Sequence, residues 1–145
     1  MLNRAESWIG DGTFEVVRKS LFYQLFIITA KMASGVYLPA LFAFLPNKEL
    51  ASYDRVFSFL MSKGVAAPTN GFHCDFEINI RKGLKNNFPG VPVYGCDTHF
   101  KRAIRAHCVN ELGLGSLLNC KEFQTLIRYI WALSLVPIDD IHKVK

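Results

Sequence analysis

Three apolar stretches near the start of the chain decide the fold: SWIGDGTFEV at residues 7–16, LFYQLFIITA at residues 21–30 and GVYLPALFAFL at residues 35–45. They are rich in aromatic and β-branched residues and are joined by short connections, which is typical of consecutive strands. The second stretch is almost continuously apolar, as a strand buried on both faces would be. Pro39 in the third predicts an edge position or a bulge. Together the stretches predict an antiparallel meander.

The hydrophobic period then changes from strands to helices. Leu50, Tyr53 and Phe57 recur at helical spacing, and Lys63-Gly64 ends that predicted helix. Short strand patterns at residues 71–76 and 91–94 alternate with two further helices, and a last helix is expected over residues 120–135. The element order β-β-β-α-β-α-β-α predicts an α/β fold of the ribonuclease H type. Its mixed sheet has three antiparallel strands, followed by alternating helices and parallel strands, and a helical segment ends the chain.

The size and composition indicate one soluble domain over residues 1–145. Half of the 145 residues are hydrophobic and a fifth are charged, which excludes disordered and collagen-like chains. The longest apolar run, residues 36–45, is too short to cross a bilayer as a helix, and we expect no export signal. Four cysteines without a dense framework favour a reducing compartment. We therefore expect an intracellular protein with no membrane partner.

The net charge of +5 is concentrated in one window. Residues 78–108 contain one acid, Asp97, and six basic residues: Arg81, Lys82, Lys85, Lys101, Arg102 and Arg105. Such a window is the electrostatic footprint expected for DNA or RNA binding. The alternative is that two solvated helix faces happen to be basic.

Two aspartates stand where a metal site would form. Asp11 lies between two glycines in a predicted strand, and Asp75 follows the strand that begins near Gly71. The glycines leave room for a ligand beside Asp11, and adjacent strands would bring the two acids together at one edge of the sheet. Convergent carboxylates are suited to Mg²⁺ or Mn²⁺. Alternatively, Asp11 forms a turn and Asp75 caps the helix that follows.

Cys96 and His99 form a C-x-x-H pair where a strand is expected to become a helix. Both side chains suit zinc, but a structural zinc site needs about four ligands, and no second pair is evident. Zinc is therefore not expected. We favour a buried Cys96 with a hydrogen-bonded His99 that fixes the junction.

In order and spacing, these motifs resemble the catalytic domain of Mutator-like element (MULE) transposases, a DDE-type group with a ribonuclease H-like fold. The matching short motifs are Asp11-Gly12-Thr13-Phe14, Tyr23-Gln24-Leu25, Leu45-Pro46-Asn47-Lys48, Asp75-Phe76-Glu77, Gly95-Cys96-Asp97-Thr98-His99 and Ala132-Leu133-Ser134-Leu135.

The resemblance implies metal-dependent DNA phosphodiester hydrolysis and strand transfer, with DNA as partner and the nucleus as location. Asp11 and Asp75 would be the first two catalytic acids and would hold Mg²⁺ or Mn²⁺, and Cys96 and His99 would be the family's C-x-x-H pair. The third acid in the family is a Glu beyond a helical insertion. Asp139 and Asp140 come too early in the sequence to be this Glu, so we expect the core to be truncated and incomplete. The resemblance also implies that the intact transposase can form a homo-oligomer.

Two other functions remain open at this stage. One is a non-catalytic module, derived from a transposon, that binds DNA or protein. The other is a ribonuclease H-type nuclease that is active on its own.

Overall fold

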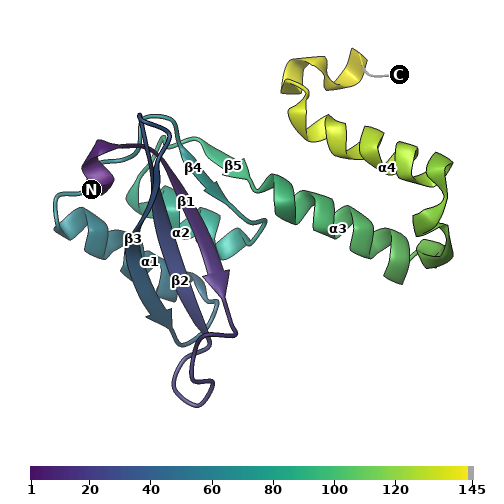
Figure 1. Ribbon diagram of the computed structural model, residues 1–145. Helices are drawn as coiled ribbons and strands as arrows, with labels where there is room; N and C mark the ends of the chain where they lie inside the picture. Colours follow the sequence, from purple (N-terminus) through teal and green to yellow (C-terminus); the bar gives the residue numbers. More distant parts are fainter. Residues whose placement is uncertain (144–145) are drawn as a thin grey trace. The chain divides into compact units, whose positions relative to one another are not determined.

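The computed structural model describes residues 1–143 and forms two compact units, Met1–Gly95 and Cys96–Lys145 (Figure 1). We refer to them as the N-terminal unit and the C-terminal unit. The single domain expected over residues 1–145 stays a prediction.

The N-terminal unit is built on a five-stranded mixed sheet with the strand order β3-β2-β1-β4-β5 (Figure 1). The first three strands are antiparallel neighbours, and β4 and β5 continue the sheet in parallel with β1. The elements are a 3₁₀ turn (Leu2–Arg4), β1 (Ala5–Thr13), β2 (Gln24–Met32), β3 (Tyr37–Leu45), α1 (Leu50–Ser62), β4 (Phe72–Cys74), α2 (Ile78–Asn87) and β5 (Val93–Gly95). The expected α/β class, the antiparallel meander and the later parallel strands are confirmed.

The core of this unit consists of large aromatic side chains between the sheet and the helices. Phe57 of α1 contacts Phe26 of β2 and Phe72 of β4 edge to face, with ring centroids 6.3 and 5.8 Å apart. Trp8 of β1 packs in the same way on Phe88, which follows α2. All but Phe88 are completely buried, so aromatic packing joins both helices to one face of the sheet.

The prediction that the second stretch is buried on both faces is wrong. Strand β2 begins at Gln24, and its residues alternate between buried and half-buried along its length. Leu21, Phe22 and Tyr23 lie before the strand and are exposed. The helices cover one face of β2 only, so apolar content alone overstated its burial.

Pro39 lies where its missing N–H is tolerated. Strand β3 is at the edge of the sheet, and the β2–β3 register shifts opposite Pro39, between Ile28 and Thr29. Both readings of this proline, an edge strand and a bulge, are confirmed. The turn before β3 closes with a hydrogen bond from Gly35 N to Met32 O, and Gly35 adopts a φ of +80°.

The C-terminal unit is a helical hairpin. Its elements are α3 (Asp97–Asn110), a 3₁₀ helix (Leu114–Asn119), α4 (Lys121–Ala132) and two further 3₁₀ segments (Leu133–Leu135 and Ile138–Lys143). Ser134, just after α4, donates a hydrogen bond to Asp97 at the start of α3, so the two helices run antiparallel. No helix within residues 1–143 is long and apolar enough to cross a membrane.

Candidate functional site

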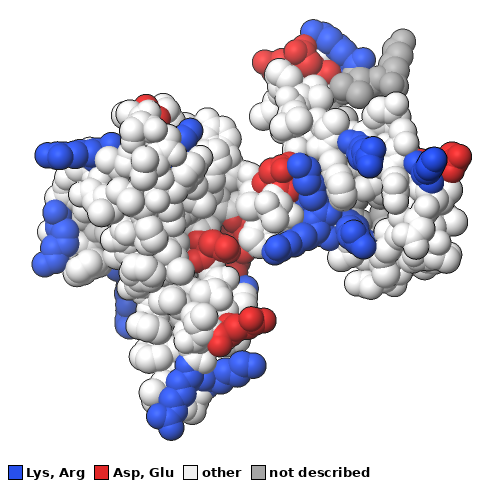
Figure 2. Space-filling view, in the orientation of Figure 1, with Lys and Arg blue, Asp and Glu red and all other residues white. Residues whose placement is uncertain are grey.

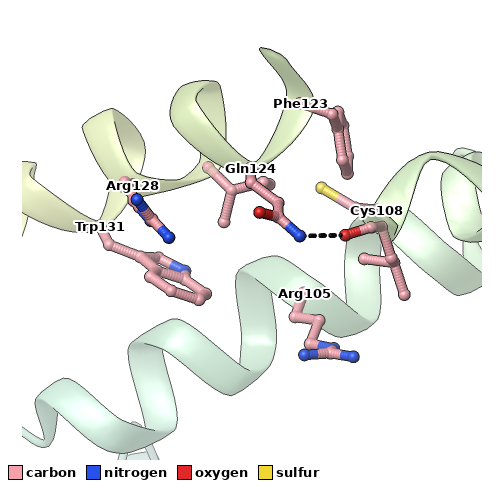
Figure 3. A pocket seen from close by; sticks show the side chains of 8 residues that line it. Arg105, Cys108, Phe123, Gln124, Arg128 and Trp131 are labelled. Carbon is pink, nitrogen blue, oxygen red and sulfur yellow. Dashed lines mark hydrogen bonds between the residues drawn. The ribbon is translucent and has the colours of Figure 1, made fainter. Parts of the chain in front are cut away.

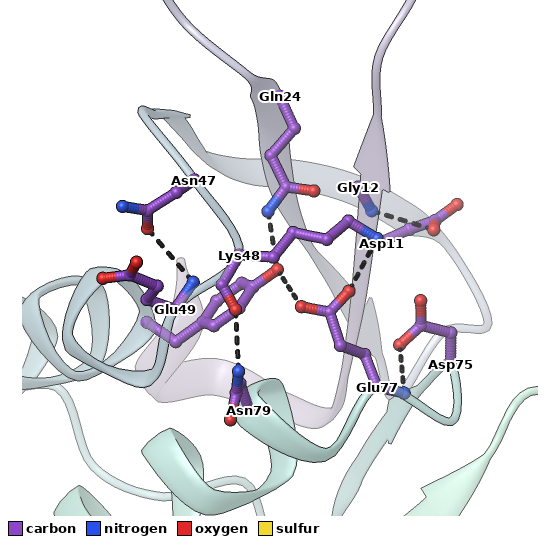
Figure 4. Close-up of polar contacts among 10 residues, drawn as sticks. Asp11, Gly12, Gln24, Asn47, Lys48, Glu49, Asp75, Glu77 and Asn79 are labelled. Atoms are coloured by element: carbon purple, nitrogen blue, oxygen red, sulfur yellow. Dashed lines mark hydrogen bonds and ion pairs between the residues drawn. The ribbon is translucent and has the colours of Figure 1, made fainter.

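The two aspartates predicted to act together lie on neighbouring strands, where the parallel pairing between β1 and β4 ends. Strand β1 pairs with β4, with Gly10 opposite Cys74, and Asp11 and Asp75 are the residues that follow this pair. Figure 4 shows both side chains at this end of the sheet. The topology therefore brings together two acids that are far apart in sequence.

Each carboxylate is oriented by a nearby backbone N–H. Asp11 Oδ1 accepts from Gly12 N at 2.9 Å, and Asp75 Oδ1 accepts from Glu77 N at 3.0 Å (Figure 4). The N-cap of α2 is Glu77 and no side chain caps the helix, so the alternative that Asp75 caps it is wrong. The Asp75 bond instead fixes the residue that precedes the helix. This bond occupies one carboxylate oxygen of Asp75 and leaves Oδ2 for another partner.

The glycines beside Asp11 have a different role from the one expected. A Cβ on Gly10 would overlap the Phe72 ring, and a Cβ on Gly12 would lie 2.5 Å from Gln24 Oε1. Both glycines therefore make room for side chains of the core. Packing of the core explains why glycine occupies both positions, without the predicted space for a ligand beside Asp11.

A chain of polar side chains, which the sequence did not single out, borders the two aspartates (Figure 4). Gln24 Nε2 donates to the Tyr53 hydroxyl at 2.6 Å. The hydroxyl donates to Glu77 Oε1 at 2.7 Å. Lys48 Nζ forms an ion pair with Glu77 Oε2 at 2.8 Å. We call these four residues the Tyr53 network. It fixes Glu77, two residues after Asp75, from both of its carboxylate oxygens.

The Tyr53 phenol remains a proton donor at all ordinary pH values. Burial raises its pKa far above the usual value of 10.0, and the hydrogen bond to the Glu77 carboxylate raises it further. A buried phenolate beside a carboxylate would be strongly unfavourable. One signal in the sequence could have revealed the network: Gln24 is a lone amide in an apolar run, and a buried amide requires partners.

His73 lies on β4 before Asp75 and stacks on Tyr94 of β5, with ring centroids 5.0 Å apart. Burial lowers the pKa of His73, and the positive charge of Lys31 lowers it further. Both effects favour the neutral form of His73.

The predicted C-x-x-H pair lies where β5 ends and α3 begins, as expected, but its side chains do not make the expected contacts. Cys96 is half-buried at the N-cap of α3, where its side chain makes no capping hydrogen bond. His99 Nδ1 is buried without a hydrogen-bond partner among the described residues. The favoured reading, a buried Cys96 with a hydrogen-bonded His99, is thus wrong in both respects.

The basic window is divided between two helices in different units. Arg81, Lys82 and Lys85 lie on α2, whereas Lys101, Arg102 and Arg105 lie on α3. Lys101 is neutralised in part by an ion pair with Asp97 at 2.6 Å. This bond, with the hydrogen bond from Ser134, lowers the pKa of Asp97. Figure 2 shows basic side chains gathered along α3. Each helix therefore presents its own set of cations.

Within residues 1–143, no three His, Cys, Asp or Glu side chains lie close enough together to hold a metal ion. A comparison of the chain with models of known families and with curated proteins finds no match. The features of this chain that bear on its function are therefore its fold and the two aspartates.

Proposed function

We propose that this chain is the catalytic core of a DDE-type transposase of the Mutator-like group. In the intact enzyme, the core would hydrolyse DNA phosphodiester bonds and take part in strand transfer. The observation that carries the proposal is the position of Asp11 and Asp75, each of which directly follows the last residue pair, Gly10 and Cys74, of the parallel β1–β4 pairing. The strand order, with three antiparallel strands followed by two parallel ones, supports a ribonuclease H-like fold.

The donor chemistry of this pair fits a hard divalent cation. Carboxylate oxygens are preferred ligands of Mg²⁺ and Mn²⁺, and backbone N–H groups already orient Asp11 and Asp75. When bound, such an ion stabilises the charge on the attacking and leaving oxygens of a phosphoryl transfer. Two acids give fewer ligands than the three that the resemblance implies, and we assign the third acid to no residue of this chain.

The remaining residues would orient the acids and the DNA. The Tyr53 network holds Glu77, and Glu77 N in turn holds the Asp75 carboxylate. Exposed cations on α2 and α3, among them Lys82, Lys85, Arg102 and Arg105, would contact backbone phosphates. Phosphate contacts position a duplex without reading its sequence.

Calorimetric titration of Mn²⁺ into the purified chain tests the proposal. We expect Asp11→Asn and Asp75→Asn each to weaken binding about tenfold or more, since each removes a charged ligand. Asparagine still accepts a hydrogen bond from Gly12 N or Glu77 N, so the local fold should persist. Asp139→Asn, in an exposed 3₁₀ segment, is the matched control. Unchanged binding in either site variant, or no binding to the folded parent chain, would overturn the proposal.

A second candidate is a DNA-binding module without catalysis, which the exposed cations on α2 and α3 favour. This module would bind duplex DNA with a strong dependence on salt. Its binding would be indifferent to Asp11→Asn and would occur without a divalent metal. An absence of Mn²⁺ binding combined with such DNA binding would select this candidate.

A further inference from the structure

The C-terminal unit contains a pocket between its two long helices (Figure 3). Helix α3 contributes Arg105 and Cys108, and α4 contributes Gln124, Arg128 and Trp131 among others. The volume of the pocket is about 220 Å³. This is below the range of about 300–1,000 Å³ that holds drug-sized ligands, so the pocket encloses part of such a ligand and not all of it. All of its walls belong to the C-terminal unit.

The charged and polar walls of the pocket are rich in donors. Arg105 and Arg128 form no ion pair within residues 1–143, and no Asp or Glu lines the pocket. The indole N–H of Trp131 is buried and finds no acceptor among the described residues. Guanidinium and indole groups donate hydrogen bonds and accept none. A ligand that supplies negative charge and several acceptors would complement these walls.

The other walls are aromatic and apolar. Figure 3 shows Trp131 and Phe123 towards opposite ends of the pocket, on the same helix. Flat aromatic faces favour planar ring systems, and guanidinium groups favour phosphate. Gln124 Nε2 donates to Leu118 O at 2.9 Å, which leaves the amide oxygen of Gln124 to accept a hydrogen bond from a ligand. A planar base that carries amino groups and a phosphate combines all of these features.

We propose that this pocket binds one nucleoside phosphate, with the base against Trp131 and the phosphate held by Arg105 and Arg128. The ligand is either a free nucleotide or one nucleotide unit of a single-stranded DNA, since both present the same chemistry. The site is separate from Asp11 and Asp75 and does not require a metal ion.

The emission of Trp131 provides a direct readout. The chain contains two tryptophans, and the other, Trp8, is completely buried in the N-terminal unit. Deoxyadenosine monophosphate and a short single-stranded oligodeoxyadenylate are titrated separately into the full chain without divalent metal. Excitation at the red edge of the indole absorption avoids adenine. We expect a saturable change in emission with at least one of the two ligands.

Matched charge variants identify the binding groups. Arg128→Gln and Arg105→Gln should each weaken binding about tenfold, because each removes a charge-assisted hydrogen bond. Arg18→Gln makes the same charge change at an exposed position of the N-terminal unit and should leave binding unchanged. Far-UV circular dichroism confirms that the variants remain helical.

The outcomes distinguish a free nucleotide, a nucleotide within a DNA strand and the absence of binding. Binding of the mononucleotide supports a free nucleotide, and binding of the oligonucleotide alone supports a strand-borne one. No saturable change with either ligand in the folded chain overturns the proposal, as does equal weakening by Arg18→Gln. Because metal is absent, these results are independent of the outcome at Asp11 and Asp75.

Discussion

The two units of this protein differ in how many of their side chains are buried. In the N-terminal unit, Trp8, Phe26, Tyr53, Phe57 and Phe72 are completely buried. Among the described residues of the C-terminal unit, Cys108 and Ile127 are the only buried side chains. Large apolar residues of that unit are instead exposed, such as Leu135 at 80% and Ile138 at 86%.

This difference indicates where the stability of the chain resides. Burial of apolar surface contributes about 25 cal/mol per Å², so the N-terminal unit gains far more per residue than the helical hairpin does. Segments with few buried contacts open locally at a lower free-energy cost. The candidate metal ligands thus stand on the well-packed unit, whereas the proposed nucleotide pocket lies in the loosely packed one.

The largest expected effect comes from a pair of phenylalanines, one in each unit. Phe57→Ala should lower the free energy of unfolding by about 3–5 kcal/mol, because it leaves a cavity among buried aromatic rings. Phe123→Ala, at a half-buried position beside the pocket, should cost about 1 kcal/mol or less. Urea denaturation followed by circular dichroism measures both. Equal costs would refute the contrast between the units.

A pair of glycines tests the same contrast by adding a methyl group. Gly10→Ala should destabilise the chain by about 1–3 kcal/mol, because the new Cβ overlaps Phe72 and lies 3.1 Å from Phe26 Cζ. Gly115→Ala places its Cβ 3.6 Å from Val109 Cγ1, an ordinary contact, and should be neutral or slightly stabilising. Thermal denaturation of both variants gives the comparison. If Gly10→Ala is as stable as the parent chain, the side chains around Phe72 can shift to accommodate the added methyl group.

A third comparison, with an expected effect similar to that of Gly10→Ala, concerns the Tyr53 network and depends on pH. Tyr53→Phe leaves Gln24 Nε2 and Glu77 Oε1 without their shared partner and should cost about 1–3 kcal/mol. Tyr129→Phe, exposed on α4, is the control and should have no effect.

The pH dependence of the same pair of variants sharpens the test. The folded state raises the pKa of Tyr53 above its ordinary value of 10.0, so its contribution is complete below pH 10 and is lost as pH rises further. The parent chain should lose up to about 1.4 kcal/mol per pH unit there through this group. Tyr53→Phe should remove that slope, and Tyr129→Phe should retain it. The measurement is the change of the urea midpoint between pH 10 and 11. The same change in the parent chain and in Tyr53→Phe would show that the phenol is not held neutral.

Local patterns predicted most of the elements in the N-terminal unit. The apolar stretches, Pro39 and the Lys63-Gly64 helix end all depend on backbone geometry and on neighbours in sequence, so they can be read without a fold. The burial of β2 was overstated, because which face of a strand is covered depends on the helices packed against it. The roles of Gly10 and Gly12 were missed for the same reason: Phe72 and Gln24 approach them only in the folded sheet.

By itself, the sequence determined the α/β element order, the edge or bulge position of Pro39, and Asp11 and Asp75 as candidate ligands. Those features follow from hydrophobic period, backbone restriction and side-chain chemistry, which are local properties. Only the tertiary structure decided that Gly10 is opposite Cys74, that Tyr53 joins Gln24 to Glu77, and that a donor-rich pocket lies beside Trp131. Contacts between distant residues depend on strand register and helix packing, and many such pairings are compatible with one local pattern.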